Sequence, residues 1–124
     1  MAERYKRYAV NVPANTETTV FTAPNDGASP AGAAESVIIG FFVAATTANA
    51  GTLTVSLTSY YDQTVVKLAD TIPLPADTSV DIMPGKMIMQ HGLNNAGSPV
   101  LVGDVIKVTS TQACSVILSM VERV

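Results

Sequence analysis

The alternation of apolar and polar positions predicts β-strands along most of this chain. Residues 36–45 form a nearly continuous apolar run of β-branched, aromatic and small residues with no helical stripe, which is typical of a strand buried on both faces. Residues 52–58 alternate strictly, with Leu53, Val55 and Leu57 on one face and Thr or Ser on the other. A turn of small residues joins the two segments. We therefore predict a β-hairpin at the centre of a sheet.

The predicted core comes from alternate apolar positions of these two strands. In a strand, residues two apart lie on the same face. The residues that we expect between the sheets are Val37, Ile39, Phe41, Leu53, Val55 and Leu57.

Shorter segments of the same kind fill the rest of the chain. They lie at residues 5–12, 16–22, 64–72, 78–82, 105–110 and 114–122, with turn residues between them, and the brief apolar segment 86–90 fits either a strand or a helical turn. This spacing, without a convincing amphipathic helix, predicts an all-β fold: an antiparallel two-sheet β-sandwich of about eight strands. The pattern does not distinguish jelly-roll from immunoglobulin-like connections. Pro13-Ala14-Asn15-Thr16 recurs as Pro75-Ala76-Asp77-Thr78, which we interpret as shared turn chemistry rather than a half-molecule repeat.

The beginning of the chain differs from the remainder. We predict an N-terminal arm over residues 1–8 and a single β-sandwich domain over residues 9–124. Basic and aromatic residues alternate in the arm, and we expect Arg4, Tyr5, Arg7 and Tyr8 to contact a neighbouring subunit, because Tyr and Arg are enriched at interface anchors. The alternative is a solvated, flexible end.

Composition favours assembly. Only 14% of the 124 residues are charged, against about 25% in an average domain. Removing water from much of the surface therefore costs little free energy. Two strands also carry apolar residues on both faces, which predicts a homo-oligomer or a larger lattice in which Ile38, Phe42, Ile117 and Val121 form contacts. The alternative is that these strands are central and covered by their own loops.

The candidate chemistry is sparse. A net charge of −3 argues against nucleic-acid binding. The single His91 and single Cys114 lie on different segments, and Asn25-Asp26-Gly27 and Asn94-Asn95 lack the spacing of a calcium loop. We predict no enzyme, no catalytic residue, no metal, no cofactor and no small-molecule substrate. The longest apolar run, of nine residues, is far below the roughly 20 that cross a bilayer, and the charged start is unlike a secretory signal, so we expect no membrane partner.

Several segments resemble, in their order along the chain, small virion proteins of tailed phages. The matching segments are Val12-Pro13-Ala14-Asn15, residues 18–24, residues 36–41, residues 47–52, residues 103–108 and residues 119–122. The chain departs from that pattern at residues 86–89 and 91–99, which leaves the position within a particle open.

The resemblance implies a non-enzymatic structural component of a phage particle, a decoration or cement protein on the head or at the neck. Its partners would be further copies of itself or other virion proteins, such as the major capsid or neck protein. Its location would be the virion, after synthesis in the bacterial host cytoplasm. The alternative function is a carbohydrate-binding or adhesin module, for which Tyr5, Tyr8, Tyr60 and Tyr61 are the only candidate aromatic platforms.

Overall fold

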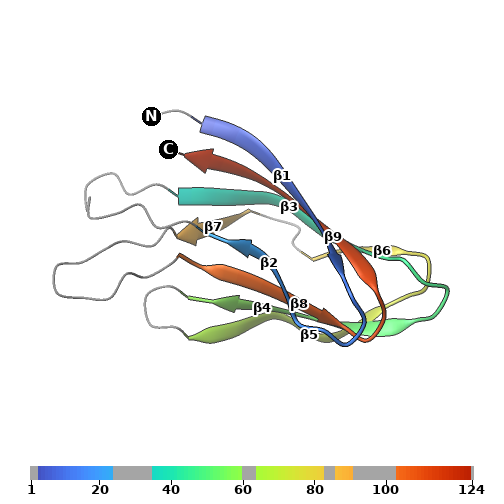
Figure 1. The fold of residues 1–124 in the computed structure, drawn as a ribbon. Coiled ribbons are helices and arrows are strands. Elements are labelled where there is room, and N and C mark those ends of the chain that lie inside the picture. Colours follow the sequence, from blue (N-terminus) through green and yellow to red (C-terminus); the bar gives the residue numbers. More distant parts are fainter. Residues whose placement is uncertain (1–2, 24–34, 60–63, 83–85, 91–102, 124) are drawn as a thin grey trace.

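Two antiparallel sheets pack face to face in the protein (Figure 1). The structure is a computed structural model that describes residues 3–23, 35–59, 64–82, 86–90 and 103–123. These residues contain nine strands and no helix, so the prediction of an all-β, antiparallel β-sandwich is confirmed. The strands are β1 (Glu3–Val12), β2 (Thr18–Thr22), β3 (Glu35–Ala45), β4 (Gly51–Thr58), β5 (Val65–Leu74), β6 (Ser79–Asp81), β7 (Met87–Gln90), β8 (Val105–Ser110) and β9 (Cys114–Arg123).

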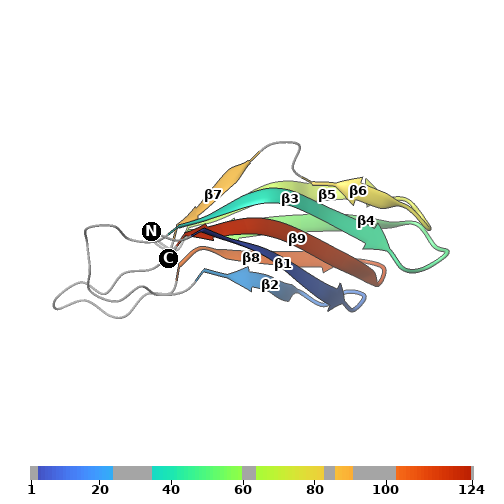
Figure 2. The same cartoon turned by 90° about the horizontal axis from the view of Figure 1, so that it is seen from above.

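The strand order decides between the two kinds of connection. Sheet A has the order β1-β9-β3-β6, with β7 also paired to β3, and sheet B has the order β2-β8-β4-β5. The first strand thus pairs with the last, the second with the next to last, and so on inward to the β4–β5 hairpin. Seen from above, β1 and β2 lie along one side of the sandwich and β5 and β6 along the other (Figure 2). A long hairpin rolled up into two layers in this way is a jelly roll.

One extra residue in β3 determines which side chains enter the core. The register of β3 with β9 shifts between Ile38 and Gly40, so Ile39 and Gly40 share the space opposite one residue of β9. Such a β-bulge reverses the alternation of faces on either side of it. Ile38 and Phe41, three positions apart, are therefore both completely buried between the sheets.

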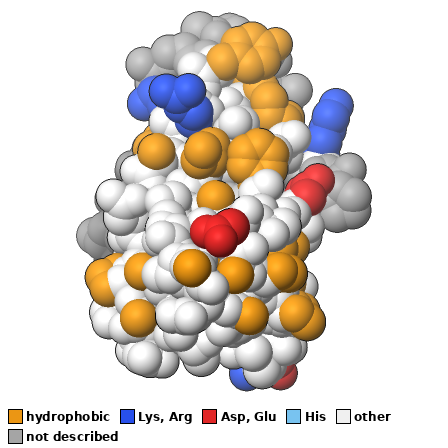
Figure 3. Space-filling model, turned by 90° about the vertical axis from the view of Figure 1, so that its right-hand side faces the viewer, with side chains coloured by type: hydrophobic (Ala, Val, Ile, Leu, Met, Phe, Trp, Pro, Cys, Tyr) orange, Lys and Arg blue, Asp and Glu red, His pale blue; other side chains and the backbone are white. Residues whose placement is uncertain are grey.

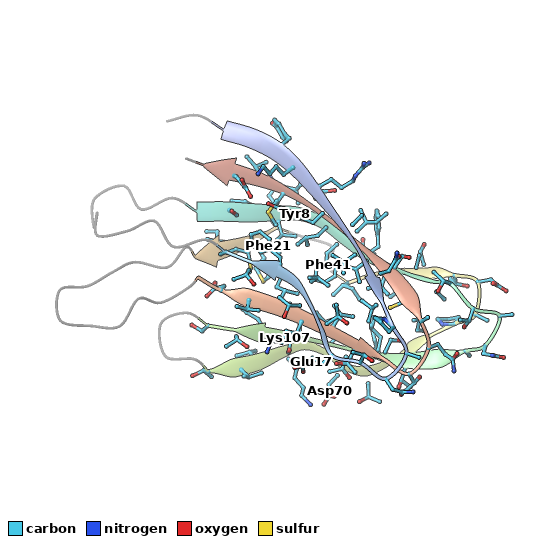
Figure 4. The ribbon with its side chains drawn as sticks, viewed as in Figure 1. Tyr8, Glu17, Phe21, Phe41, Asp70 and Lys107 are labelled. Atoms are coloured by element: carbon cyan, nitrogen blue, oxygen red, sulfur yellow. The ribbon has the colours of Figure 1, made fainter. Side chains whose placement is uncertain are left out.

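The bulge overturns part of the predicted core. Val37 faces outward and is only partly buried, and Ile39 is 42% exposed, so the prediction was wrong for both residues. Phe41 is buried as predicted, and Figure 4 shows it between the two sheets. In β4, Leu53 and Val55 are fully buried and Leu57 packs against the core, as the strict alternation predicted.

The predicted N-terminal arm is part of a sheet where it is described. Residues 3–12 pair continuously with β9 of the same chain, from Glu3 opposite Arg123 to Val12 opposite Cys114. The interpretation that residues 1–8 lie over a neighbouring subunit is therefore wrong from residue 3 onward. The alternation of Tyr and basic residues reflects the two faces of an edge strand, and was mistaken for an interface clasp.

The two Pro-Ala-Asx-Thr turns have the same local structure. Asn15 and Asp77 have φ angles of 56° and 54°, in the left-handed region that Asn and Asp tolerate better than other non-glycine residues. In each turn the following Thr hydroxyl donates to the carbonyl of the preceding Ala, at 3.2 Å for Thr16 and 2.9 Å for Thr78. Each turn connects a strand of one sheet with a strand of the other.

Candidate interaction surfaces

Two rows on the outer face of sheet A are apolar, and a row that contains Arg7, Ser119 and Gly40 lies between them. Cross-strand partners share a face, so the register places Tyr5, Val121, Val37 and Ile88 in one row across four strands. A second row contains Ala9, Ile117, Phe42 and Asp81. The residues that we call the sheet A patch are Tyr5, Ala9, Val37, Ile39, Phe42, Ile88, Ile117 and Val121.

The sheet A patch leaves large side chains in water. Tyr5 is 78% exposed, Ile88 53%, Phe42 45% and Ile39 42%. Figure 3 views the molecule from one end, and apolar side chains reach that surface in its upper part, where Figure 1 places sheet A, and in its lower part as well. Single exposed apolar residues are ordinary, but a contiguous group of them indicates an interaction surface.

Charges of opposite sign stand at opposite edges of this face. Arg7 pairs with Ser119 on the outer face of the edge strand β1 and is exposed. Asp81 pairs with Phe42 on the outer face of β6, at the other edge, and is exposed as well. Arg7 lies in the row of Ser119 and Gly40, between the two apolar rows, and Asp81 lies in the second apolar row.

The outer face of sheet B is mostly polar. Thr54 and Ser56 of β4 pair there with Thr109 and Lys107 of β8, and Thr58 lies between Val105 and the exposed Val65. Lys107 reaches Glu17 at 3.7 Å across this surface (Figure 4). The described outer face of sheet A is therefore the more apolar of the two.

The β1–β2 side of the sandwich is closed by a small polar and aromatic group. The Tyr8 hydroxyl donates to Glu122 Oε1 at 2.7 Å, and Lys6 Nζ lies 3.4 Å from Glu122 Oε2. The Tyr8 ring packs on the Phe21 ring at 5.2 Å between centroids (Figure 4). Glu122 is only 6% exposed, and its carboxylate forms an ion pair with Lys6. This group joins sheet A to sheet B.

The structure distributes the predicted interface residues over three places. Tyr5, Phe42, Ile117 and Val121 come together in the sheet A patch, with Arg7 at its edge. Ile38 is fully buried in the core on the opposite face, so its assignment to a surface was wrong, because the bulge reverses the alternation. Tyr8 is half-buried between the sheets rather than presented outward. The side chain of Arg4 lies outside the described part of the chain.

Sequence reasoning missed three contributors to the same surface. The sequence places Val37 and Ile39 in the core, and it does not distinguish a strand from a helical turn over residues 86–90, which contain Ile88. Gly40 lies inside an apolar run, and an isolated glycine in a strand often marks a bulge. This glycine was the signal in the sequence that could have indicated the shift in alternation.

The described residues also limit the chemistry. They contain no group of three or more His, Cys, Asp and Glu side chains arranged to hold a metal ion. Every buried side-chain nitrogen and oxygen among them has a hydrogen-bond partner. Burial raises the pKa of the Cys114 thiol, while a hydrogen bond with Ser110 opposes that shift, so the neutral thiol is favoured. His91, residues 25–27, Asn94-Asn95, Tyr60 and Tyr61 lie outside the described residues.

No helix in the described segments is long and apolar enough to span a membrane.

Comparison with known proteins identifies the fold but no sequence family. No protein-family model matches the chain, and no curated protein matches it. Among solved structures, one of the Gx strain of infectious bursal disease virus covers 97% of this chain, with a TM-score of 0.55 and 15% identity. A mutant VP2 protein of the same virus, in T=1 particles, also covers 97%, with a TM-score of 0.56 and 14% identity. The chain spans about a third of each matched structure, 32% and 31% of their lengths.

Proposed function

We propose that this protein is a non-enzymatic structural component of a virus particle. The observation that carries the proposal is the sheet A patch, a group of exposed apolar residues on one outer face of a domain whose other outer face is mostly polar. A protein that worked as an isolated monomer would gain from polar residues at Phe42, Ile39 and Ile88, because each exposed apolar group favours association. Assembly is the simplest use of such a face.

The fold supports the choice of a virus particle among possible assemblies. The jelly roll occurs in viral capsid domains, although it also occurs in lectins and other proteins. The likeness to structures from infectious bursal disease virus extends over 97% of the chain. Fold alone does not imply function, so this likeness supports the proposal by analogy.

Within that role, the resemblance to small tailed-phage virion proteins favours a decoration or cement protein on the head or at the neck. Its partners would then be copies of itself and the major capsid or neck protein. It would be made in the cytoplasm of the bacterial host and act in the virion. The carbohydrate-binding alternative has less support in the described residues, because Tyr8 is packed between the sheets and Tyr5 alone of the candidate tyrosines is exposed on a described face.

The test is to look for the protein in particles. Particles from a culture that encodes this chain would be purified by density-gradient centrifugation and quantified by mass spectrometry against the major capsid protein. We expect a fixed stoichiometry that survives a high-salt wash, because apolar contacts are little screened by salt. For a decoration protein, particles lacking it should assemble but rupture at lower temperature, and adding the purified protein should restore them. Absence of the protein from purified particles would overturn the proposal.

A further inference from the structure

If the sheet A patch serves assembly, another protein surface must cover it. The positions of Arg7 and Asp81 beside the patch indicate which surface that is. We propose that the patch is covered by the same patch of a second copy of this chain, in a face-to-face dimer whose two-fold axis runs along the strands. A two-fold interface buries the same patch on both copies, so the patch has to be complementary to itself.

The registered rows satisfy this condition. A two-fold axis along the strands, between β9 and β3, places β1 of one copy over the β6–β7 edge of the other. Val121 then lies over Val37 of the second copy, and Ile117 lies over Phe42 of the second copy. Tyr5, the most exposed apolar residue of the patch, lies over the edge residue Ile88 of the second copy.

The charges at the two edges agree with the same axis. Arg7 on β1 is brought to the β6–β7 edge of the second copy, one row away from Asp81, and the reciprocal contact forms on the other side. One row is about 7 Å along a strand, which a long Arg side chain spans. A two-fold axis across the strands would instead stack Arg7 on Arg7 of the second copy, and like charges in contact oppose association. Charge therefore selects the axis along the strands.

The size of the face is sufficient for a specific but modest dimer. Four strands about 4.8 Å apart and about seven residues long give a footprint of roughly 20 Å by 20 Å. Two such faces hide on the order of 1,000 Å² or more of accessible surface, close to the lower limit for specific interfaces. Two twisted sheets pack about 10 Å apart at an angle of about 30°, so contact is closest near the centre of the patch, where Ser119 and Gly40 lie between the row of Val121 and the row of Ile117 and Phe42.

Sedimentation of the purified full chain tests the proposal. The wild type should form dimers as its concentration rises into the range of tens to hundreds of micromolar, as expected for a small interface. Phe42→Asp should weaken dimerisation at least tenfold. The matched control is Val65→Asp, an apolar residue that is 60% exposed and pairs with Thr58 on the outer face of sheet B; it should leave dimerisation unchanged. If Phe42→Asp fails to fold, as judged by circular dichroism, Ile88→Asp at the patch edge replaces it.

A charge exchange tests the axis itself. Arg7→Asp and Asp81→Arg should each weaken the dimer several-fold, since each brings like charges together, and the double variant should restore it to within about threefold of the wild type. A wild type that stays monomeric at high concentration, or a dimer insensitive to Phe42→Asp, would overturn the proposal. Single variants that weaken the dimer without rescue in the double variant would overturn the axis. This dimer goes beyond the proposed function, and the two fail separately: a monomeric protein can still be found in particles, and a dimer can be absent from them.

Discussion

Phe41 and Phe42 are neighbours in sequence but lie on opposite faces of β3. Phe41 is fully buried between the sheets, whereas Phe42 is 45% exposed on the outer face. Both are phenylalanines in the same strand, so any difference between their contributions to stability comes from their environments. Burial of an aromatic ring in a close-packed core is one of the larger single contributions to the stability of a small domain.

Alanine substitution at the two positions should therefore have very different effects. Phe41→Ala should lower the free energy of unfolding by about 3–5 kcal/mol, because it removes buried area and leaves a cavity. Phe42→Ala should lower it by about 1 kcal/mol or less when measured on the monomer, as is usual for surface positions. Urea denaturation monitored by circular dichroism measures both. Equal losses would show that Phe42 also belongs to the core.

Asn15 illustrates how a single residue sets a turn. Its φ of 56° is a conformation that costs most L-residues about 1–2 kcal/mol. Asn15→Ala should therefore destabilise the protein by about 1 kcal/mol, and Asn15→Gly should be close to neutral. The backbone amide that donates to the Ser110 carbonyl at 2.7 Å is retained in both variants, so the comparison isolates the backbone conformation. A thermal midpoint that falls equally in both would point to the Asn side chain instead.

At the scale of elements, the sequence predicts the strands, but it does not predict the bulge in β3 that decides which of its side chains face the core. Strict alternation in residues 52–58 identified both the strand and its buried face, because nothing interrupts the pleat there. In residues 36–45 both faces are apolar, so the sequence predicts the strand but does not determine where its alternation shifts. The residues of the sheet A patch were consequently divided between core and surface. Strand order depends on pairing between distant segments, such as residues 3–12 with residues 114–123, which local patterns do not encode.

Deleting single residues from β3 tests the role of the bulge. Without Ile39, Ile38 and Gly40 still face Met120 and Ser119, and regular alternation carries Phe41 into the core. This deletion should leave the fold intact, with a loss of about 2 kcal/mol or less. Deleting Phe42 should prevent folding, because keeping Val43 inward then turns Phe41 outward. Near-ultraviolet circular dichroism and thermal melting distinguish the outcomes, and an unfolded protein lacking Ile39 would contradict the assignment.

At the scale of the whole molecule, the first strand is part of the fold and closes one edge of sheet A. Tyr8 contributes both a hydrogen bond with Glu122 and a ring contact with Phe21 of sheet B. The pairing of β1 with β9 also provides hydrogen-bond partners for the edge of β9 that faces away from β3. These contacts connect the two ends of the described chain and both layers.

Removing residues 3–8 should therefore destabilise the isolated domain. The deletion loses several strand hydrogen bonds, worth about 1 kcal/mol each, together with the packing of Tyr8. The total approaches the 5–15 kcal/mol by which small domains are stable, so we expect an aggregated or partly unfolded protein. The control is Tyr5→Ala combined with Arg7→Ala, which changes only outward-facing side chains and should leave the melting temperature nearly unchanged. Unaltered melting of the truncated protein would show that β1 is dispensable.

The pairing of first and last strands also determines how the molecule resists force. Glu3 and Arg123 are partners at one end of an antiparallel ladder, so tension applied between those ends opens the β1–β9 pair one rung at a time. Each rung then carries the whole load alone, and a hydrogen bond contributes only about 1 kcal/mol net. The protein should unzip at low force when pulled by its ends. An attachment through the broad face of sheet A would leave the β1–β9 ladder without this load, whereas tension between Glu3 and Arg123 falls on it directly.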